Sequence, residues 1–182
     1  SKPSGLLSVR GKESQTSVET WAENICRDYS GPKIVHRLDQ DTSGIMVIAL
    51  NINAYHHLQK QFENHSIKKK YVALTEKIPS IKEQTIILPL APDITNRPMQ
   101  MISREYGLYA ETYYKVVNEK EGKAMIDVYP RTGRTHQIRV HLSCKEGADA
   151  PIVGDRLYGS KSIVCRLMLH AEKITFEHPS TK

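Results

Sequence analysis

Hydrophobic positions along the chain follow two spacings, and the change from one to the other separates helical from extended segments. From Val18 to Ile25, apolar residues recur every three to four positions, which is typical of an amphipathic helix. Residues 16–19 have the form of a capping box, with Thr16 and Glu19 as its two members. The pattern therefore predicts a helix that begins at this box and ends near residues 30–32.

An uninterrupted apolar run at residues 45–50 follows a polar loop. A short run of this kind predicts a strand that is buried on both faces. Asn51 follows directly, and apolar side chains from Ala54 to Phe62 lie on one side of a helix that Asn51 can cap.

Beyond this second helix the chain changes to short runs of β-branched and aromatic residues, which predict strands. The predicted strands are residues 70–76, 85–90, 110–117, 124–129 and 166–176. We expect a hairpin connection at residues 118–122 and a short helix that is capped by Thr135 and runs to Leu142. The order indicates an α+β fold with a mixed, mainly antiparallel sheet and flanking helices and loops.

Length and charge narrow the classes of protein that this chain can represent. Its 182 residues fit a single domain, 1–182, and its abrupt ends lead us to expect truncation at both termini. Lys and Arg number 26 against 20 Asp and Glu, a balance of +6 that favours a polyanionic partner. With 39% hydrophobic residues the composition is not that of a disordered chain. The longest apolar run is far below the roughly 18 residues of a spanning helix, so no membrane is expected.

The cysteines indicate the compartment. Cys26, Cys144 and Cys165 are far apart and form neither a CxxC pair nor a zinc-ligand spacing. We therefore expect a reducing, cytoplasmic environment.

Two polar segments carry the candidate chemistry. Asp39 lies in a loop, residues 36–43, that is crowded with different polar side chains, and such a loop can hold a catalytic carboxylate. The alternative is an Asp that bonds nearby backbone amides in a turn. Arg131, Arg134 and Arg139 cluster further along, and one of them can hold Asp39 ionised. Alternatively, all three face solvent or phosphate.

A third segment pairs lysines with an aromatic ring. Residues 68–70 are lysines and Tyr71 follows them, a combination that can bind phosphates and stack on an unpaired base. The alternative is an ordinary solvated charge run before a strand.

Other chemistries find little support. Ser43 with His36 and Asp39 suggests a hydrolase, but the Gly-x-Ser-x-Gly elbow is missing. His136 and His141 are five residues apart and make a poor metal pair. No phosphate-binding glycine loop is present, so we expect neither a metal nor a cofactor.

Together these segments resemble the RluA-type pseudouridine synthase family. Its motifs are matched, in chain order, by residues 2–9 (KPSGLLSV), 36–39 (HRLD) with 42–44 (TSG), 70–73 (KYVA) and 132–142 (TGRTHQIRVHL). Residues 154–159 (GDRLYG) and 169–171 (LHA) add to the likeness. Residues 88–90, Asp93 and residues 96–100 further resemble the RluA branch, which modifies both ribosomal and transfer RNA.

The resemblance implies an enzyme, an isomerase that converts uridine in RNA to pseudouridine without metal or cofactor. It implies that Asp39 is the essential carboxylate. Whether this carboxylate adds to the base, adds to the ribose or removes a ribose proton is left open. Tyr71 would stack on the uracil and can serve as a general base, and Arg139 would hold Asp39 by a salt bridge. Arg37 would take the space of the flipped nucleotide. The residues expected to contact RNA are Arg37, Lys70, Arg134, His136, Ile138 and Leu169.

The partners implied are stem-loops of ribosomal RNA, transfer RNA or both, bound by a monomer. A second hypothesis is an RNA-binding or chaperone module that keeps the fold but has little activity. The two hypotheses differ in whether replacing Asp39 removes any turnover.

Overall fold

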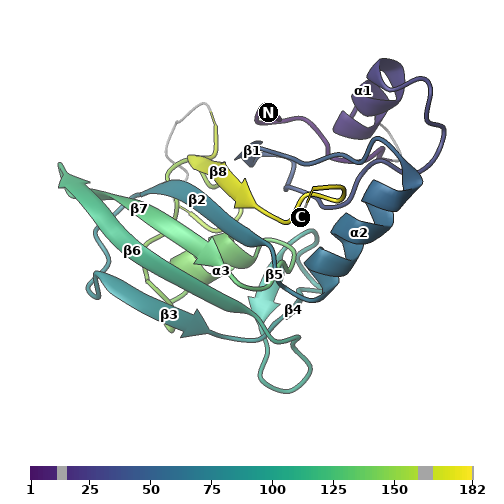
Figure 1. Ribbon diagram of the computed structural model, residues 1–182. Helices are drawn as coiled ribbons and strands as arrows, with labels where there is room; N and C mark the ends of the chain where they lie inside the picture. Colours follow the sequence, from purple (N-terminus) through teal and green to yellow (C-terminus); the bar gives the residue numbers. More distant parts are fainter. Residues whose placement is uncertain (12–15, 160–165, 182) are drawn as a thin grey trace. The chain divides into compact units, whose positions relative to one another are not determined.

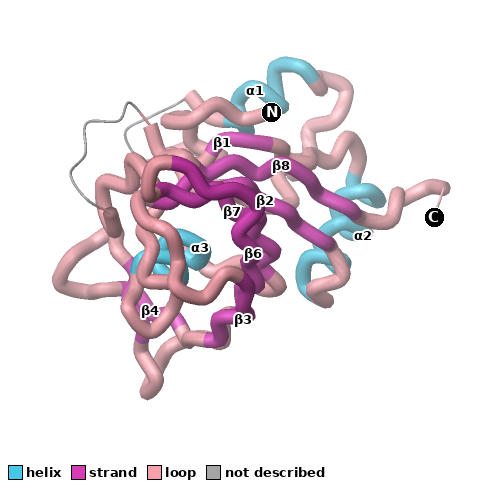
Figure 2. The backbone as a smooth tube through the Cα atoms, turned by 90° about the vertical axis from the view of Figure 1, so that its left-hand side faces the viewer, coloured by secondary structure: helices cyan, strands magenta, loops and turns pink. Residues whose placement is uncertain are grey.

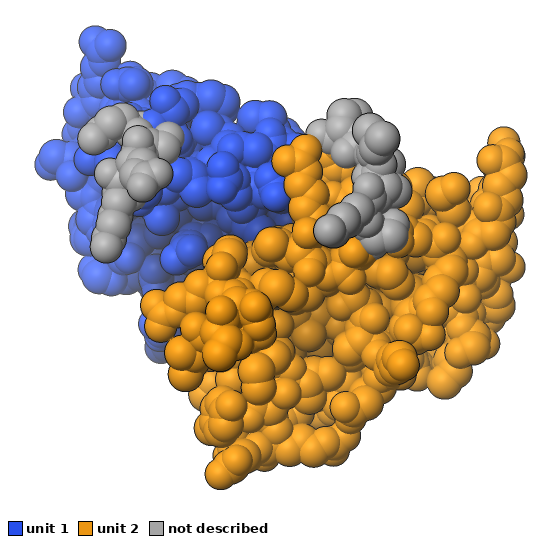
Figure 3. Space-filling model, turned by 180° about the vertical axis from the view of Figure 1, so that it is seen from behind, with its two compact units in different colours: residues 1–68, 171–182 blue, residues 69–170 orange. Residues whose placement is uncertain are grey.

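The computed structural model describes residues 1–11, 16–159 and 166–181. Its elements are, in chain order, α1 (Val18–Ile25), β1 (Ser43–Gly44), α2 (Ile52–Glu63), β2 (Lys68–Thr75), β3 (Glu83–Ile87), β4 (Leu90–Pro92), β5 (Gln100–Ile102), β6 (Glu111–Lys120), β7 (Lys123–Pro130), α3 (Gln137–Ser143) and β8 (Leu169–Thr175) (Figure 1). The chain forms two compact units, residues 1–68 with 171–182 (unit 1) and residues 69–170 (unit 2), coloured blue and orange in Figure 3.

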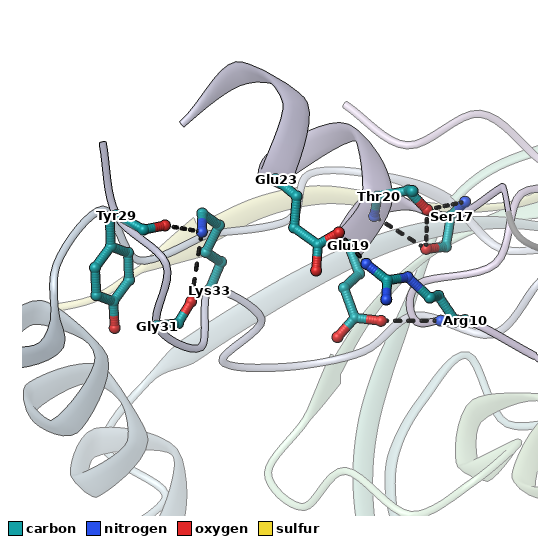
Figure 4. A network of polar contacts seen from close by, with 8 residues as sticks. All are labelled: Arg10, Ser17, Glu19, Thr20, Glu23, Tyr29, Gly31 and Lys33. Carbon is teal, nitrogen blue, oxygen red and sulfur yellow. Dashed lines mark hydrogen bonds and ion pairs between the residues drawn. The ribbon is translucent and has the colours of Figure 1, made fainter. Parts of the chain in front are cut away.

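In unit 1, helix α1 begins one residue later than the sequence predicts. Ser17 is the N-cap: its hydroxyl accepts from the Thr20 N–H, and the Ser17 N–H donates to the Thr20 hydroxyl (Figure 4). The predicted cap pair was wrong because the Glu19 carboxylate accepts from the Arg10 N–H instead. The helix ends at Ile25, short of residues 30–32, because the next residue leaves helical backbone geometry.

The predicted buried strand at residues 45–50 is also wrong. Only Ser43–Gly44 is extended in a ladder, and Ile45 and Leu50 are 40% and 59% exposed. The backbone N–H groups of this segment bond to separate partners and not to one strand: Ile45 to the Ala171 carbonyl, Val47 to the His36 ring at 2.9 Å and Ala49 to the Lys33 carbonyl.

Helix α2 agrees with the prediction. The Asn51 side chain caps it by accepting from the Ala54 N–H at 2.8 Å. Leu58 anchors the helix in a small core with Val35 and Ala49, against which Phe62 and Phe176 pack.

Unit 2 is built on antiparallel strands in the order β2-β7-β6-β3, which run side by side in Figure 2. The β6–β7 connection is tighter than the predicted 118–122. Only Glu121 and Gly122 lie between the strands, both at positive φ (52° and 74°), as a two-residue hairpin turn requires.

The other predicted strands of unit 2 differ at their ends. The predicted strand 85–90 divides into β3 and β4, and β4 pairs with β5, which the sequence pattern did not reveal. The last strand of the chain, β8, is Leu169–Thr175, shorter than the predicted 166–176, and most of its residues belong to unit 1.

Helix α3 packs against β6 and β7 over a core of fully buried side chains, among them Tyr114, Ile126 and Leu142. Thr135 does not cap it. His136 is the N-cap, at a left-handed φ of 53° and without a side-chain capping hydrogen bond. The Gln137 side chain accepts from the Arg134 N–H at 3.0 Å. The predicted α+β class with mainly antiparallel pairing is confirmed.

Candidate active site

In unit 1, the N-terminal segment holds the loop that carries Asp39. The Ser8 hydroxyl donates to the Leu38 carbonyl at 2.6 Å and accepts from the Leu38 N–H at 3.0 Å. On the other side, the Gly5 N–H donates to the Gln40 carbonyl at 2.9 Å. Both chain neighbours of the half-buried Asp39 are thus tied down, which fixes the backbone from which its carboxylate projects.

A buried cation lies beneath this loop. Lys2 is only 2% exposed, and its ammonium donates to the carbonyls of Pro3, Leu6 and Gln40 at 3.1, 2.7 and 2.7 Å. Burial lowers the pKa of Lys2 to about 8, opposed by the negative charges of Asp41 and Asp39. At pH 7 the ammonium is therefore mainly protonated, beside two carboxylates.

His36, at the start of the loop that carries Asp39, is also held by specific contacts. Its Nε2 accepts from the Val47 N–H, and its ring stacks on Phe62 with centroids 4.8 Å apart. A ring nitrogen engaged in this way is not available as a base for Ser43, which removes support for the hydrolase reading. Arg37, between His36 and the buried Leu38, is exposed.

In unit 2, Arg139 is held by a buried ion pair. Its Nε and Nη2 donate to the two carboxylate oxygens of Asp155 at 2.8 and 2.7 Å, and the residues are 3% and 1% exposed. Asp155 is itself fixed by the backbone N–H groups of Leu157 and Tyr158. The expected pairing of Arg139 with Asp39 joins residues of the two units and stays a prediction.

Tyr158 links Arg139 to His136. Its ring lies 5.1 Å from the guanidinium carbon of Arg139, a cation–π distance. Its hydroxyl accepts from the Gln100 N–H and is hydrogen-bonded to His136 Nδ1, both at 2.7 Å. One aromatic side chain therefore orients two of the residues proposed from sequence.

The residues expected to surround the uracil share one core. Tyr71 lies on β2 opposite Val128, is half-buried, and packs against a cluster that contains Ile138 and Leu169. A ring supported by this packing has a fixed plane on which a base can stack.

The basic residues of unit 2 differ in how they are held. Lys70 forms an ion pair with Asp127 at 3.0 Å, and the exposed Arg134 donates from Nε to the Tyr109 carbonyl at 3.1 Å. Lys69 donates to the Thr132 carbonyl at 3.0 Å, and burial lowers its pKa to about 8.

Sequence reasoning missed the roles of Lys2, Asp155 and Tyr158. All three lie in segments that carried the family likeness, residues 2–9 and 154–159, but their contacts depend on residues distant in the chain. Across the described ranges, no group of three His, Cys, Asp or Glu side chains could hold a metal ion. None of the described helices has the length and apolarity needed to cross a bilayer.

Comparisons with known proteins agree with this geometry. A family model described as RNA pseudouridylate synthase matches residues 1–144. The dual-specificity RNA pseudouridine synthase RluA of Escherichia coli K12 is 44% identical over 185 aligned residues, which cover 98% of this chain and 82% of that protein.

Two solved human structures have the same fold. RNA pseudouridylate synthase domain containing 4 superposes with a TM-score of 0.76 at 25% identity, covering 95% of this chain and 78% of that chain. Domain containing 1 superposes with a TM-score of 0.77 at 26% identity, covering 93% and 70%.

Proposed function

The chain belongs to the RNA pseudouridylate synthase family and is an enzyme that isomerises uridine in RNA; we propose that Asp39 is its essential carboxylate. The observation that carries this proposal is the frame around the loop, in which Ser8, Gly5 and Lys2 bind the residues on either side of Asp39. A carboxylate on a fixed backbone has little freedom to lose when the substrate binds, as catalysis by positioning requires.

We propose that Tyr71 and Arg37 hold the target nucleotide outside the RNA stack. A uridine in folded RNA must leave its stack before its glycosidic bond can be reached, at a cost of a few kcal/mol. Stacking on an aromatic ring returns about 1–3 kcal/mol, and the core packing of Tyr71 supports it in that role. The exposed Arg37, two residues before Asp39, would occupy the space that the base leaves.

Arg139 is proposed to hold Asp39 charged and oriented. A guanidinium has five N–H groups, and the pair with Asp155 engages one on Nε and one on Nη2. The donors on Nη1 point away from that fork, so the same group can bind a second carboxylate. Asp155 and Tyr158 would then set the direction in which Arg139 meets Asp39.

We propose that the substrates are stem-loops of both ribosomal and transfer RNA. This is supported by the likeness of residues 88–90, Asp93 and residues 96–100 to the RluA branch, and by the "dual-specificity" in the name of the relative that is 44% identical. Lys70, Arg134 and His136 would contact the RNA around the base, within a chain whose charge is +6.

The free thiols of Cys26 and Cys144 support a cytoplasmic location. We propose a monomer in which residues 1–182 are one catalytic domain.

The test uses transfer and ribosomal RNA that carries tritium at uridine C5, which pseudouridine formation releases. We expect release with the unaltered chain and a loss of about a thousandfold or more in rate with Asp39→Ala and Asp39→Asn. RNA affinity, measured by filter binding, should change little in both variants.

Two results would contradict the proposal. Equal release by the Asp39 variants would remove Asp39 from the chemistry. Tight RNA binding without release by the unaltered chain would favour the RNA-binding module instead.

A further inference from the structure

Unit 1 contains a hollow of about 570 Å³ at the C-terminal end of α2. Its size falls in the range of sites that take small molecules or single nucleotides. None of its lining residues belongs to the proposed catalytic set. They are His57, Lys60, Gln61, Asn64, Ser66, Lys68, Thr175, Phe176 and Glu177.

The wall of the hollow is held in place by hydrogen bonds. The Gln61 side chain donates to the Glu177 carbonyl and accepts from the Glu177 N–H, both at 2.9 Å. The Ser66 hydroxyl donates to the Gln61 carbonyl at 3.2 Å. These bonds join the end of α2 to the segment after β8, so a ligand would find the site formed in advance.

One polar atom at the hollow lacks a partner. His57 Nε2 is buried and has no hydrogen bond within the described part of the chain. Leaving a buried donor or acceptor unpaired costs about 1–3 kcal/mol. The side chain that carries this unpaired atom lines the hollow.

The charges at the hollow indicate a particular ligand. Lys60 and Lys68 are exposed and form no ion pair among the described residues, so both can approach a phosphate. Glu177 and the negative end of the α2 dipole oppose a bare anion. A nucleotide fits better, because its base can donate hydrogen bonds to these acceptors and pack on the half-buried Phe176 ring.

We propose that this hollow, lined by His57, Lys60 and Lys68, binds an unpaired nucleotide of the substrate RNA other than the target uridine. The inference rests on the proposed function. Lys68 begins β2, and Tyr71 lies three residues further along the same strand, about 10 Å away. Because side chains alternate between the two faces of a strand, those of Lys68 and Tyr71 point to opposite faces of β2 and would contact different parts of the RNA.

The first experiment removes the two positive charges. Lys60→Gln/Lys68→Gln is compared with Lys123→Gln/Lys145→Gln, which removes equal charge from exposed lysines outside the hollow. We expect the first double variant to raise KM for RNA about tenfold with kcat unchanged, and the control pair to change KM less than twofold. The salt dependence of log Kd should become shallower by about 0.7, the value for one single-strand phosphate contact.

The second experiment locates the nucleotide. RNA with 4-thiouridine outside the target position is cross-linked to the unaltered chain, and the modified peptides are identified by mass spectrometry. We expect cross-links on the segments 57–68 or 175–177, and their loss in Lys60→Gln/Lys68→Gln. Uridine monophosphate at about 1 mM should not displace them, because the RNA is also held elsewhere.

The outcomes separate the two proposals. If the unaltered chain releases no tritium from RNA, the proposed function fails. If it turns over normally while both double variants behave alike and no cross-link reaches the hollow, only the nucleotide site is overturned. Displacement of the cross-links by uridine monophosphate would also overturn it, in favour of a free-nucleotide site. Thermal unfolding of each variant shows whether a loss comes from misfolding.

Discussion

The loop around Asp39 in unit 1 and the cluster around Arg139 in unit 2 are held by different interactions. Backbone groups of the Asp39 loop are bound by Ser8, Gly5 and the Lys2 ammonium. Arg139 is held by side chains, through its ion pair with Asp155 and the ring of Tyr158. The loop should therefore tolerate many side-chain changes but few changes of backbone shape, and the cluster should behave in the opposite way.

The largest effect is expected from Asp155→Asn. It leaves the buried Arg139 guanidinium without its ionic partner, and breaking a buried pair from one side costs about 3–5 kcal/mol of unfolding free energy. The matched control is Lys77→Gln, which breaks an exposed ion pair with Asp149 and should cost less than about 1 kcal/mol. Urea denaturation measures both. Equal losses would mean that the burial of the pair does not determine its contribution.

A backbone change should instead disturb the Asp39 loop. Gly44 has a φ of 126°, and a Cβ there would lie 2.3 Å from the Ala171 carbonyl oxygen. We expect Gly44→Ala to cost about 2–3 kcal/mol of unfolding free energy and to lower kcat. Gly122→Ala has a positive φ of 74° but open space, so it should cost only about 1–2 kcal/mol and leave kcat unchanged. A normal kcat in Gly44→Ala would separate loop geometry from catalysis.

The smallest effect concerns pH. Because the folded pKa of Lys2 is lowered from 10.5 to about 8, the unfolded chain binds more protons between these values. The Lys2 contribution to the unfolding free energy should therefore rise from pH 8 to 10.5, by about 1–3 kcal/mol. Urea titrations at several pH values should show this slope reduced in Lys2→Met. Lys69→Met in unit 2, with the same lowered pKa, should reduce it similarly. An unchanged slope in both variants would contradict the lowered pKa values of Lys2 and Lys69.

Local patterns along the chain predicted the elements whose partners are close in sequence. Asn51 caps α2 through an amide three residues away, and the strands of unit 2 show their alternating burial in the residue order itself. The same locality explains the near misses: Ser17 and Thr20 compete with Thr16 and Glu19 one residue earlier, and only the contact of Glu19 with Arg10 decides between them.

The sequence by itself determined the α+β class, the antiparallel strands and, through motif likeness, the family and the candidate residues. Tertiary structure decided what those residues contact. Residues 45–50 do not form the predicted strand, and their N–H groups bond to separate segments, Val47 to the His36 ring and Ala49 to the Lys33 carbonyl. Arg139 pairs with Asp155, 16 positions further along the chain. A local sequence pattern indicates hydrogen-bond partners within a few residues. Long-range partners depend on how the folded backbone brings distant segments together, and a short window of sequence does not contain that information.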